Sequence, residues 1–162
     1  MNWLFLLHQA LFGGIAAAGF GVLFNCPPRI LPQCFGAGAL ALLLRTVAQN
    51  ASLNLAEASF VAALAVATVD RLLQHFPSTR GSILSVVGCI PMIPGSIAAR
   101  GLSDLYALLR AKPGDEVLHD ASDGIKNLVI VAFTLAAIGT ALAIPSLLFP
   151  RKPQTLSVEA DS

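Results

Sequence analysis

Long apolar blocks, separated by short polar turns, make up most of this chain. An α-helix needs about 20 apolar residues to cross the hydrocarbon core of a bilayer, and several of the blocks have that length. The pattern therefore predicts an all-α integral membrane protein, folded as a bundle of about five transmembrane helices. The expected spans are residues 3–24, 33–48, 55–73, 82–109 and 125–148.

The expected spans form one transmembrane domain, residues 1–150, and residues 151–162 form a polar C-terminal tail. The first apolar block has no Lys or Arg before it and is too long for the core of a signal peptide, so we expect an uncleaved span. The second block, 33–48, is short, rich in Gly and Ala, and contains Arg45. A run of this length can be a buried helix, a re-entrant segment or a tilted span; we expect a full span that neighbouring helices shield from lipid.

The fourth span is predicted to be broken at Pro91 and at Pro94–Gly95. Each proline lacks a backbone N–H and collides with the carbonyl four residues earlier, so the C=O groups of Val87 and Ile90 would lose their helical partners. In hydrocarbon an unpaired carbonyl costs roughly several kcal/mol, so such a break persists only where protein or a watery cavity covers it. We interpret the segment as a discontinuous helix beside a polar pathway, as in transporters.

The two halves of the broken span suggest the chemistry of a ligand. The second half would begin at Gly95 or Ser96, with Ser96 as N-cap and free N–H groups near Ser96 and Ile97, which favour a carboxylate. The first half would present carbonyls, which suit an ammonium group. Both preferences together suit a small amino acid, whereas the helix start with the nearby Arg100 suits a dicarboxylate. The alternative is a proline kink that only shapes packing.

Charged residues within apolar blocks are further candidates. An ionised side chain inside the membrane costs about 2.5–3.5 kcal/mol unless it is paired or hydrated. Arg45 and Glu57 could bind substrate, carry protons or pair with each other; equally, both could snorkel from helix ends beside the polar turn 49–52. Glu57, Thr68 and Arg71 fall on one helical stripe, so we expect that stripe to face protein or water.

Composition and motifs exclude several function classes. Charged residues make up 12% of the chain, about half of the roughly 25% found in soluble domains. The net charge of +1 says nothing about nucleic acid, but the sequence has no basic patch, so we expect no nucleic-acid partner. The three cysteines lack CxxC or metal-like spacing, and no HExxH, GxSxG or Walker motif occurs. We therefore predict no enzymatic activity, no catalytic residue, no metal and no cofactor.

The distribution of Lys and Arg suggests an orientation. With five spans, the positive charges divide equally between the two sides of the membrane. The tie is broken because Arg45 and Arg100 can lie within the membrane, whereas Arg151 and Lys152 directly follow the last span. We expect the N-terminus outside and the C-terminus in the cytoplasm.

Three segments carry a resemblance to a known family. Residues 21–29 read GVLFNCPPR, residues 90–95 read IPMIPG, and residues 144–147 read IPSL, with Arg151 and Lys152 after them. They resemble the F-N-x-P-x-R boundary, the I-P-x-x-P-G break and the closing span of the threonine/serine exporter family. The likeness is greatest for the short subunit of the split form of this exporter, and it extends over nearly the whole chain.

The resemblance implies an exporter of small hydrophilic metabolites in the bacterial inner membrane. Threonine and serine are the name-giving substrates of the family, and the split bacterial pair is associated with succinate export. The residues that carry over by resemblance are Asn25, Pro27, Arg29, Pro91, Pro94 and Gly95. The arguments from the residues add, as a hypothetical substrate pathway, Arg45, Glu57, Thr68, Ser96 and Arg100.

The resemblance also implies a partner. This chain is similar to the second half of a fused form, so a second exporter subunit with a soluble N-terminal region and about five spans would supply the first half. A second copy of this chain is the other candidate partner within the lipid bilayer. The leading hypothesis is a subunit of a secondary transporter. The alternative is a structural or regulatory membrane subunit with no transport pathway of its own.

Overall fold

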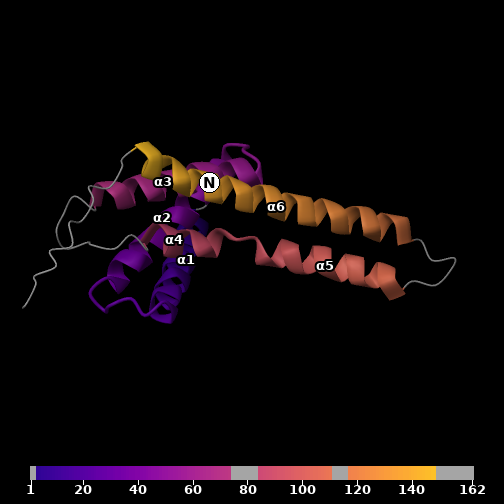
Figure 1. Cartoon of the computed structure of the whole chain (residues 1–162), viewed down its shortest axis with the longest axis horizontal. Coiled ribbons are helices and arrows are strands. Elements are labelled where there is room, and N and C mark those ends of the chain that lie inside the picture. Colours follow the sequence, from indigo (N-terminus) through magenta and orange to yellow (C-terminus); the bar gives the residue numbers. More distant parts are fainter. Residues whose placement is uncertain (1–2, 74–83, 111–116, 149–162) are drawn as a thin grey trace, which may run out of the picture.

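The computed structural model describes residues 3–73, 84–110 and 117–148. Within these ranges the chain is helical and contains no strand, which confirms the all-α prediction for this part of the protein (Figure 1). A 3-10 turn, Ile90–Met92, follows the fourth described helix. The helices are α1 (Trp3–Leu23), α2 (Leu31–Asn50), α3 (Leu55–Leu73), α4 (Leu84–Cys89), α5 (Gly95–Arg110) and α6 (Val117–Leu148).

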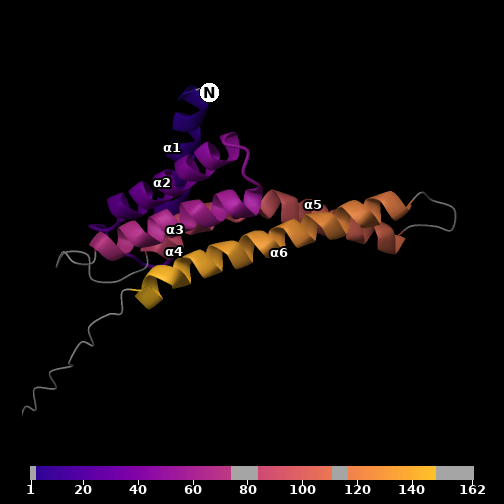
Figure 2. The same ribbon diagram turned by 90° about the horizontal axis from the view of Figure 1, so that it is seen from above.

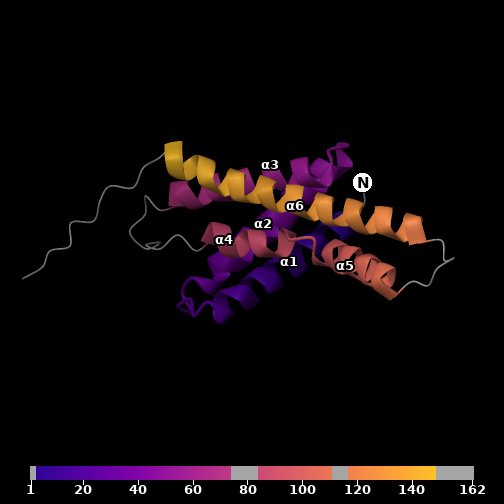
Figure 3. The ribbon, with the colours of Figure 1, turned by 45° about the vertical axis from the view of Figure 1, so that its right-hand side comes forward.

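The longest described helix, α6, packs against both α3 and α5. Its C-terminal half packs along α3, and its N-terminal half packs along α5, which extends beyond the other helices (Figures 1 and 3). Helix α2 contacts α1, α3 and α4, and Figure 2 shows α1 running across the direction of α6. The short helix α4 therefore lies among α1, α2 and α3, whereas α5 packs chiefly against α6.

Small residues allow the helices to approach closely. At the α1–α2 crossing, a Cβ atom on Gly13 would lie 2.8 Å from the carbonyl oxygen of Gly38. Where α4 meets α2, a Cβ atom on Gly88 would lie 2.8 Å from the Cβ of Ala37. Close approach of this kind replaces the hydrophobic driving force that is missing between helices in lipid. The buried core is correspondingly built mainly of Ala, with Met92 among its largest wholly buried side chains.

Three described helical segments are long and apolar enough to cross a membrane: α1, α2 and residues Ala121–Leu148 of α6. The pair α4–α5 makes a fourth if the two bent halves are one span. Helix α3 is not among them, and it contains Glu57, Asp70 and Arg71. The structure thus supports three or four of the expected spans, and the count of five stays a prediction.

Two helices are longer than the spans expected from the sequence. The second helix covers Leu31–Asn50 rather than 33–48, which makes it long enough for a full span. The last helix begins at Val117 rather than near 125, because its early turns pack on α5: a Cβ atom on Gly124 would lie 3.2 Å from the carbonyl oxygen of Gly101. The bounds of α1 and α3 agree with the prediction within one residue. The expected tail, 151–162, lies outside the described residues.

Candidate functional site

The helix between residues 84 and 110 is interrupted where the prolines predict it. Helix α4 ends at Cys89, the 3-10 turn follows, Ile93 is extended (φ −64°, ψ 123°), and α5 begins at Gly95. The axes of the two halves differ by 49°. Both a broken span and a re-entrant loop have this geometry. That α4 and α5 together form one broken transmembrane helix therefore stays a prediction.

Most carbonyl groups at the break have a hydrogen-bond partner. The Ile93 N–H donates to the Ile90 carbonyl at 3.0 Å, and the Gly95 N–H donates to the Ile93 carbonyl at 2.8 Å. The Met92 carbonyl accepts from the side chain of Arg45. The expectation that the Ile90 carbonyl lacks a partner is therefore wrong, because the 3-10 turn brings a different N–H to it.

The start of α5 also differs from the expectation. The N–H groups of Ile97 and Ala98 both donate to the Pro94 carbonyl, at 3.1 and 3.0 Å. Pro94 is thus the N-cap residue, and Ser96 lies inside the first turn rather than at the N-cap. The expected free N–H of Ile97 is already used by the backbone. An anion at this helix start would depend on side chains more than on free backbone donors.

Arg45 is the charged residue that the fold brings to the break. It lies on α2, forty-seven positions before Met92, and its Nη1 donates to the Met92 carbonyl at 2.7 Å. Met92 is wholly buried between the two prolines. The Nε of Arg45 is buried and has no hydrogen-bond partner among the described residues. The guanidinium therefore holds the exposed backbone of the break while it keeps unused donor capacity.

A polar pocket of about 350 Å³ lies beside this hydrogen bond. Three parts of the chain form its wall: the start of α1, the end of α2 and the break itself. Among the residues that the structure describes, Arg45 is the only charged residue in the wall, and no acidic residue lines it. A cavity of this kind suits a small anion that is recognised by a guanidinium and by neutral polar groups. The lining residues are Phe5, Gln9, Leu42, Arg45, Thr46, Gln49, Pro91, Ile93, Pro94, Gly95, Ser96 and Ile97.

The turn that contains Asn25, Pro27 and Arg29 lies elsewhere. The pocket uses Phe5 at the start of α1, and Asn25 follows the end of that helix, about 30 Å away at 1.5 Å per residue. All three turn residues are exposed. The structure thus places them at the opposite end of the α1–α2 hairpin, and their role in a substrate pathway stays a prediction.

The local geometry gives Asn25 a structural role. Its φ is 57°, in the left-handed region that Asn tolerates better than most residues. Its N–H donates to the Val22 carbonyl, and the Cys26 N–H donates to the Gly21 carbonyl, both at 2.9 Å. These two bonds form a Schellman motif, which closes the C-terminus of α1. Pro27 then follows at the position where a proline prevents the helix from continuing.

Three other predicted residues also lie away from the break. Glu57 is exposed, and its Oε2 accepts from the Asn54 N–H at 3.0 Å, as in a capping box at the start of α3. The Thr68 hydroxyl donates to the Leu64 carbonyl of its own helix at 2.7 Å. Arg100 is exposed on α5 and does not line the pocket. As pathway residues, all three stay predictions.

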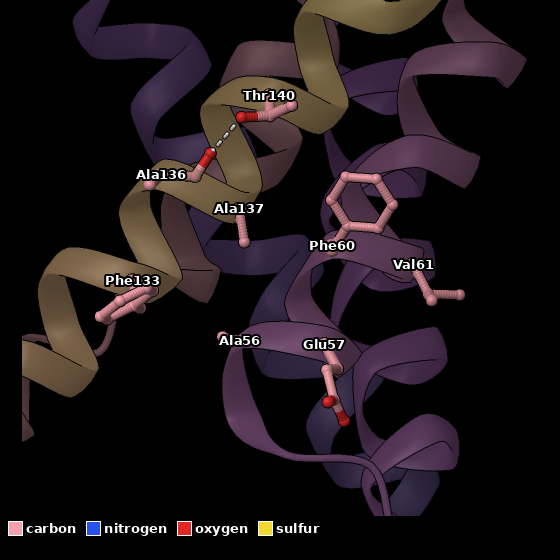
Figure 4. A pocket seen from close by; sticks show the side chains of 8 residues that line it. All are labelled: Ala56, Glu57, Phe60, Val61, Phe133, Ala136, Ala137 and Thr140. Carbon is pink, nitrogen blue, oxygen red and sulfur yellow. Dashed lines mark hydrogen bonds between the residues drawn. The ribbon is translucent and has the colours of Figure 1, made fainter.

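A second cavity, of about 530 Å³, lies on the outer face between α3 and α6 (Figure 4). Its wall is almost wholly apolar, and the hydroxyl of Thr140 is already bonded to the Ala136 carbonyl at 2.8 Å. Glu57 lies at the opposite end of the cavity from Thr140 (Figure 4). Exposed Val61 and Phe133 make this an apolar groove suited to hydrocarbon. A hydrophilic solute is better served by the pocket at the break.

The sequence did not identify several polar residues of the pocket as site residues. Gln9 is an isolated polar residue in the first apolar block, and Gln49 follows Arg45 by four positions, which places both on one face of α2. Outside the pocket, Asp70 is buried and its Oδ2 accepts from the Ser85 N–H at 3.3 Å, which joins α4 to α3. Within the described ranges, no three His, Cys, Asp or Glu side chains are placed to hold a metal ion.

Comparison with known proteins shows which family the chain resembles. The family model described as threonine/serine exporter, ThrE, matches residues 9–148. A protein of Haemophilus influenzae described as uncharacterized is 30% identical over 147 residues, which cover 91% of this chain and 48% of that relative. The chain thus spans about half the length of the curated relative. No solved structure matches the chain.

Proposed function

The chain belongs to the threonine/serine exporter family, and we propose that it is one membrane subunit of a secondary exporter whose substrate site is the pocket at the helix break. The observation that carries the proposal is Arg45, a cation placed by the fold beside interrupted backbone and a polar cavity. Charged residues within membrane proteins usually serve substrate or ion pathways. Interrupted helices in transporters serve the same purpose.

The charges of the pocket favour a carboxylate substrate. Threonine and serine carry an ammonium group as well as a carboxylate, and an ammonium group needs acidic side chains or free carbonyls. No acidic residue in the described part of the chain lines the pocket, and the carbonyls of Ile90, Met92, Ile93 and Pro94 each accept a hydrogen bond already. We therefore propose a small dicarboxylate such as succinate ahead of threonine or serine. Gln9, Thr46 and Gln49 would bind the end of the substrate that Arg45 leaves free.

The proposal includes a partner and an orientation. This chain covers only about half of its longer relative, so we propose that a second membrane subunit, with about five spans and a soluble N-terminal region, completes the pathway. A second copy of this chain is the alternative partner. The protein is a multi-pass membrane protein; we place it in the bacterial inner membrane with the N-terminus outside and the C-terminus in the cytoplasm.

Export from cells tests the proposal directly. In a strain that lacks this gene and that of its partner, we expect intracellular succinate to rise several-fold and extracellular succinate to fall. Wild-type protein should restore export, and Arg45→Gln should not, although both reach the membrane in equal amounts. Unchanged succinate, threonine and serine in the deletion strain would refute the exporter proposal. Purified partner that transports fully without this chain would instead favour a structural or regulatory subunit.

A further inference from the structure

The guanidinium of Arg45 donates to a backbone carbonyl and also lines a pocket in which a second acceptor could compete for the same N–H groups. Its Nη1 holds the Met92 carbonyl at 2.7 Å, and the same side chain lines the pocket of about 350 Å³. A substrate carboxylate that enters the pocket therefore meets a cation that is already engaged with backbone. Whatever the carboxylate does to this side chain is transmitted to the break.

The competition favours the carboxylate. A guanidinium binds a carboxylate through two parallel, charge-assisted hydrogen bonds, which are stronger than a bond to a neutral amide carbonyl. In the structure the Nε edge of Arg45 is buried, without a partner among the described residues. The other two-pronged edge, Nη1 with Nη2, is therefore the one left for the pocket, and the side chain shifts to present both nitrogens to a carboxylate. Such a movement draws Nη1 away from Met92.

The packing on either side of the break determines whether α4 or α5 moves when the Met92 carbonyl is released. Helix α4 is held by α2 and α3, through the close approach of Gly88 to Ala37 and through the Ser85–Asp70 hydrogen bond. After the break, a Cβ atom on Gly95 would meet no atom within 4 Å, and α5 packs chiefly against α6. Release of the Met92 carbonyl therefore frees α5 to move relative to α4, about the extended residue Ile93.

We propose that Arg45 is a positioning residue that couples occupancy of the pocket to the bend of the broken helix. With the pocket empty, Arg45 holds the Met92 carbonyl and keeps the 49° bend; when a carboxylate binds, Arg45 releases that carbonyl and the bend changes. A ligand shifts such an equilibrium only through its different affinity for the two states, and here the difference is the freed guanidinium. The proposed function enters only in the choice of a carboxylate as the ligand.

A distance between spin labels measures the bend. One label at Val86 on α4 and one at Leu102 on α5 use exposed positions on either side of the break, in full-length protein whose native cysteines are replaced. Leu102 lies seven residues beyond Gly95, about 10 Å along α5, so a change of about 20° in the bend would move it by about 4 Å. The probes are succinate and succinamide, which has the same shape without the carboxylates.

The expected results separate a coupling role from a purely structural one. Succinate should shift the distance in the wild type, and succinamide should not. Arg45→Gln should show the shifted distance without ligand and no response to succinate. Arg45→Lys, which keeps the charge but loses the two-pronged geometry, should respond only at tenfold or more higher succinate. Arg110→Gln, an exposed arginine at the end of α5, is the matched control and should behave as the wild type.

Two outcomes would overturn the coupling. One is an Arg45→Gln distance that equals the wild-type distance without ligand and shifts at the same succinate concentration. The other is a wild type that does not respond to succinate. If cells nevertheless export succinate in an Arg45-dependent way, the exporter proposal survives and only the coupling fails. If export is absent while succinate still shifts the wild-type distance and Arg45→Gln removes that response, the coupling stands and only the exporter proposal fails.

Discussion

Gly38 on α2 marks the place where the α1–α2 hairpin leaves least room for a side chain. A Cβ atom there would contact the Cβ of Ala17 and the carbonyl oxygen of Gly13, both well inside the 3.4 Å at which ordinary contact begins. One of the two atoms belongs to backbone, so no change of rotamer relieves the overlap, and α1 must move away from α2. We therefore expect Gly38→Ala to destabilise the protein.

The loss of stability in Gly38→Ala can be estimated from Gly13, which lies on α1 at the same crossing. A Cβ atom on Gly13 would lie 2.8 Å from the Gly38 carbonyl oxygen, 0.6 Å inside the 3.4 Å limit. Opening packed surfaces by about 0.5–1 Å forfeits a quarter to a half of their dispersion attraction. Overpacking of a core costs about 1–3 kcal/mol. At roughly 2–4 °C per kcal/mol for a chain of this size, the Tm should fall by about 2–12 °C.

Gly36, two residues earlier on the same helix, provides the matched control. A Cβ atom there would meet no atom within 4 Å, and Ala is a better helix former than Gly by about 0.5–1 kcal/mol. Gly36→Ala should therefore keep or raise the Tm. Thermal unfolding in detergent can be followed with a thiol-reactive dye, because the buried Cys34 and Cys89 become accessible on unfolding. A Gly38→Ala protein that melts at or above the temperature of Gly36→Ala would refute the reasoning.

Further predictions concern the turn after α1, the start of α3 and the break. Asn25 has φ 57°, so Asn25→Gly should leave the Tm nearly unchanged, whereas Asn25→Val should lose about 1–2 kcal/mol in the same dye assay. Glu57→Ala removes a capping acceptor and should lower the Tm by about 1–3 °C, without changing export per molecule of folded protein. Arg45→Leu leaves the Met92 carbonyl without its donor, and Pro94→Ala lets the helix continue. The double variant should therefore lose about 1 kcal/mol less than the sum of the singles; additive losses in a denaturant titration would contradict this coupling.

The backbone chemistry of single residues made much of the fold predictable. Proline cannot donate a hydrogen bond wherever it stands, so the interruption at Pro91 and Pro94 could be read locally. The ends of α2 and α6 could not be read in this way. Polar Gln49 and Asn50 resemble a turn in isolation, yet they continue α2. The early turns of α6 are helical because Gly124 packs against α5, a contact between distant parts of the chain.

The candidate site was only partly visible for the same reason. Arg45 could be singled out by its charge, and the break by its prolines, but their contact joins residues far apart in sequence. Hydrophobic periodicity carries no information on which helices become neighbours. Gln9 entered the pocket only through the packing of α1 against α2. Asn25 and Glu57, which the sequence marks as candidates for the substrate pathway, each take part in capping a helix, and their pathway role stays a prediction.

The helix break and Arg45 stabilise each other. In a membrane protein an unpaired carbonyl costs roughly several kcal/mol, and an unpaired arginine about 2.5–3.5 kcal/mol. Here the arginine is the donor for the carbonyl, so each group removes part of the other's cost. A kink that served packing alone could be satisfied by a neutral hydroxyl or by adjustment of the helix itself. A charged donor beside a cavity whose described lining residues include no acid can also bind an anion, which a neutral donor does far less well. The choice of arginine, rather than the presence of the bend, is therefore the strongest physical argument for a transport pathway.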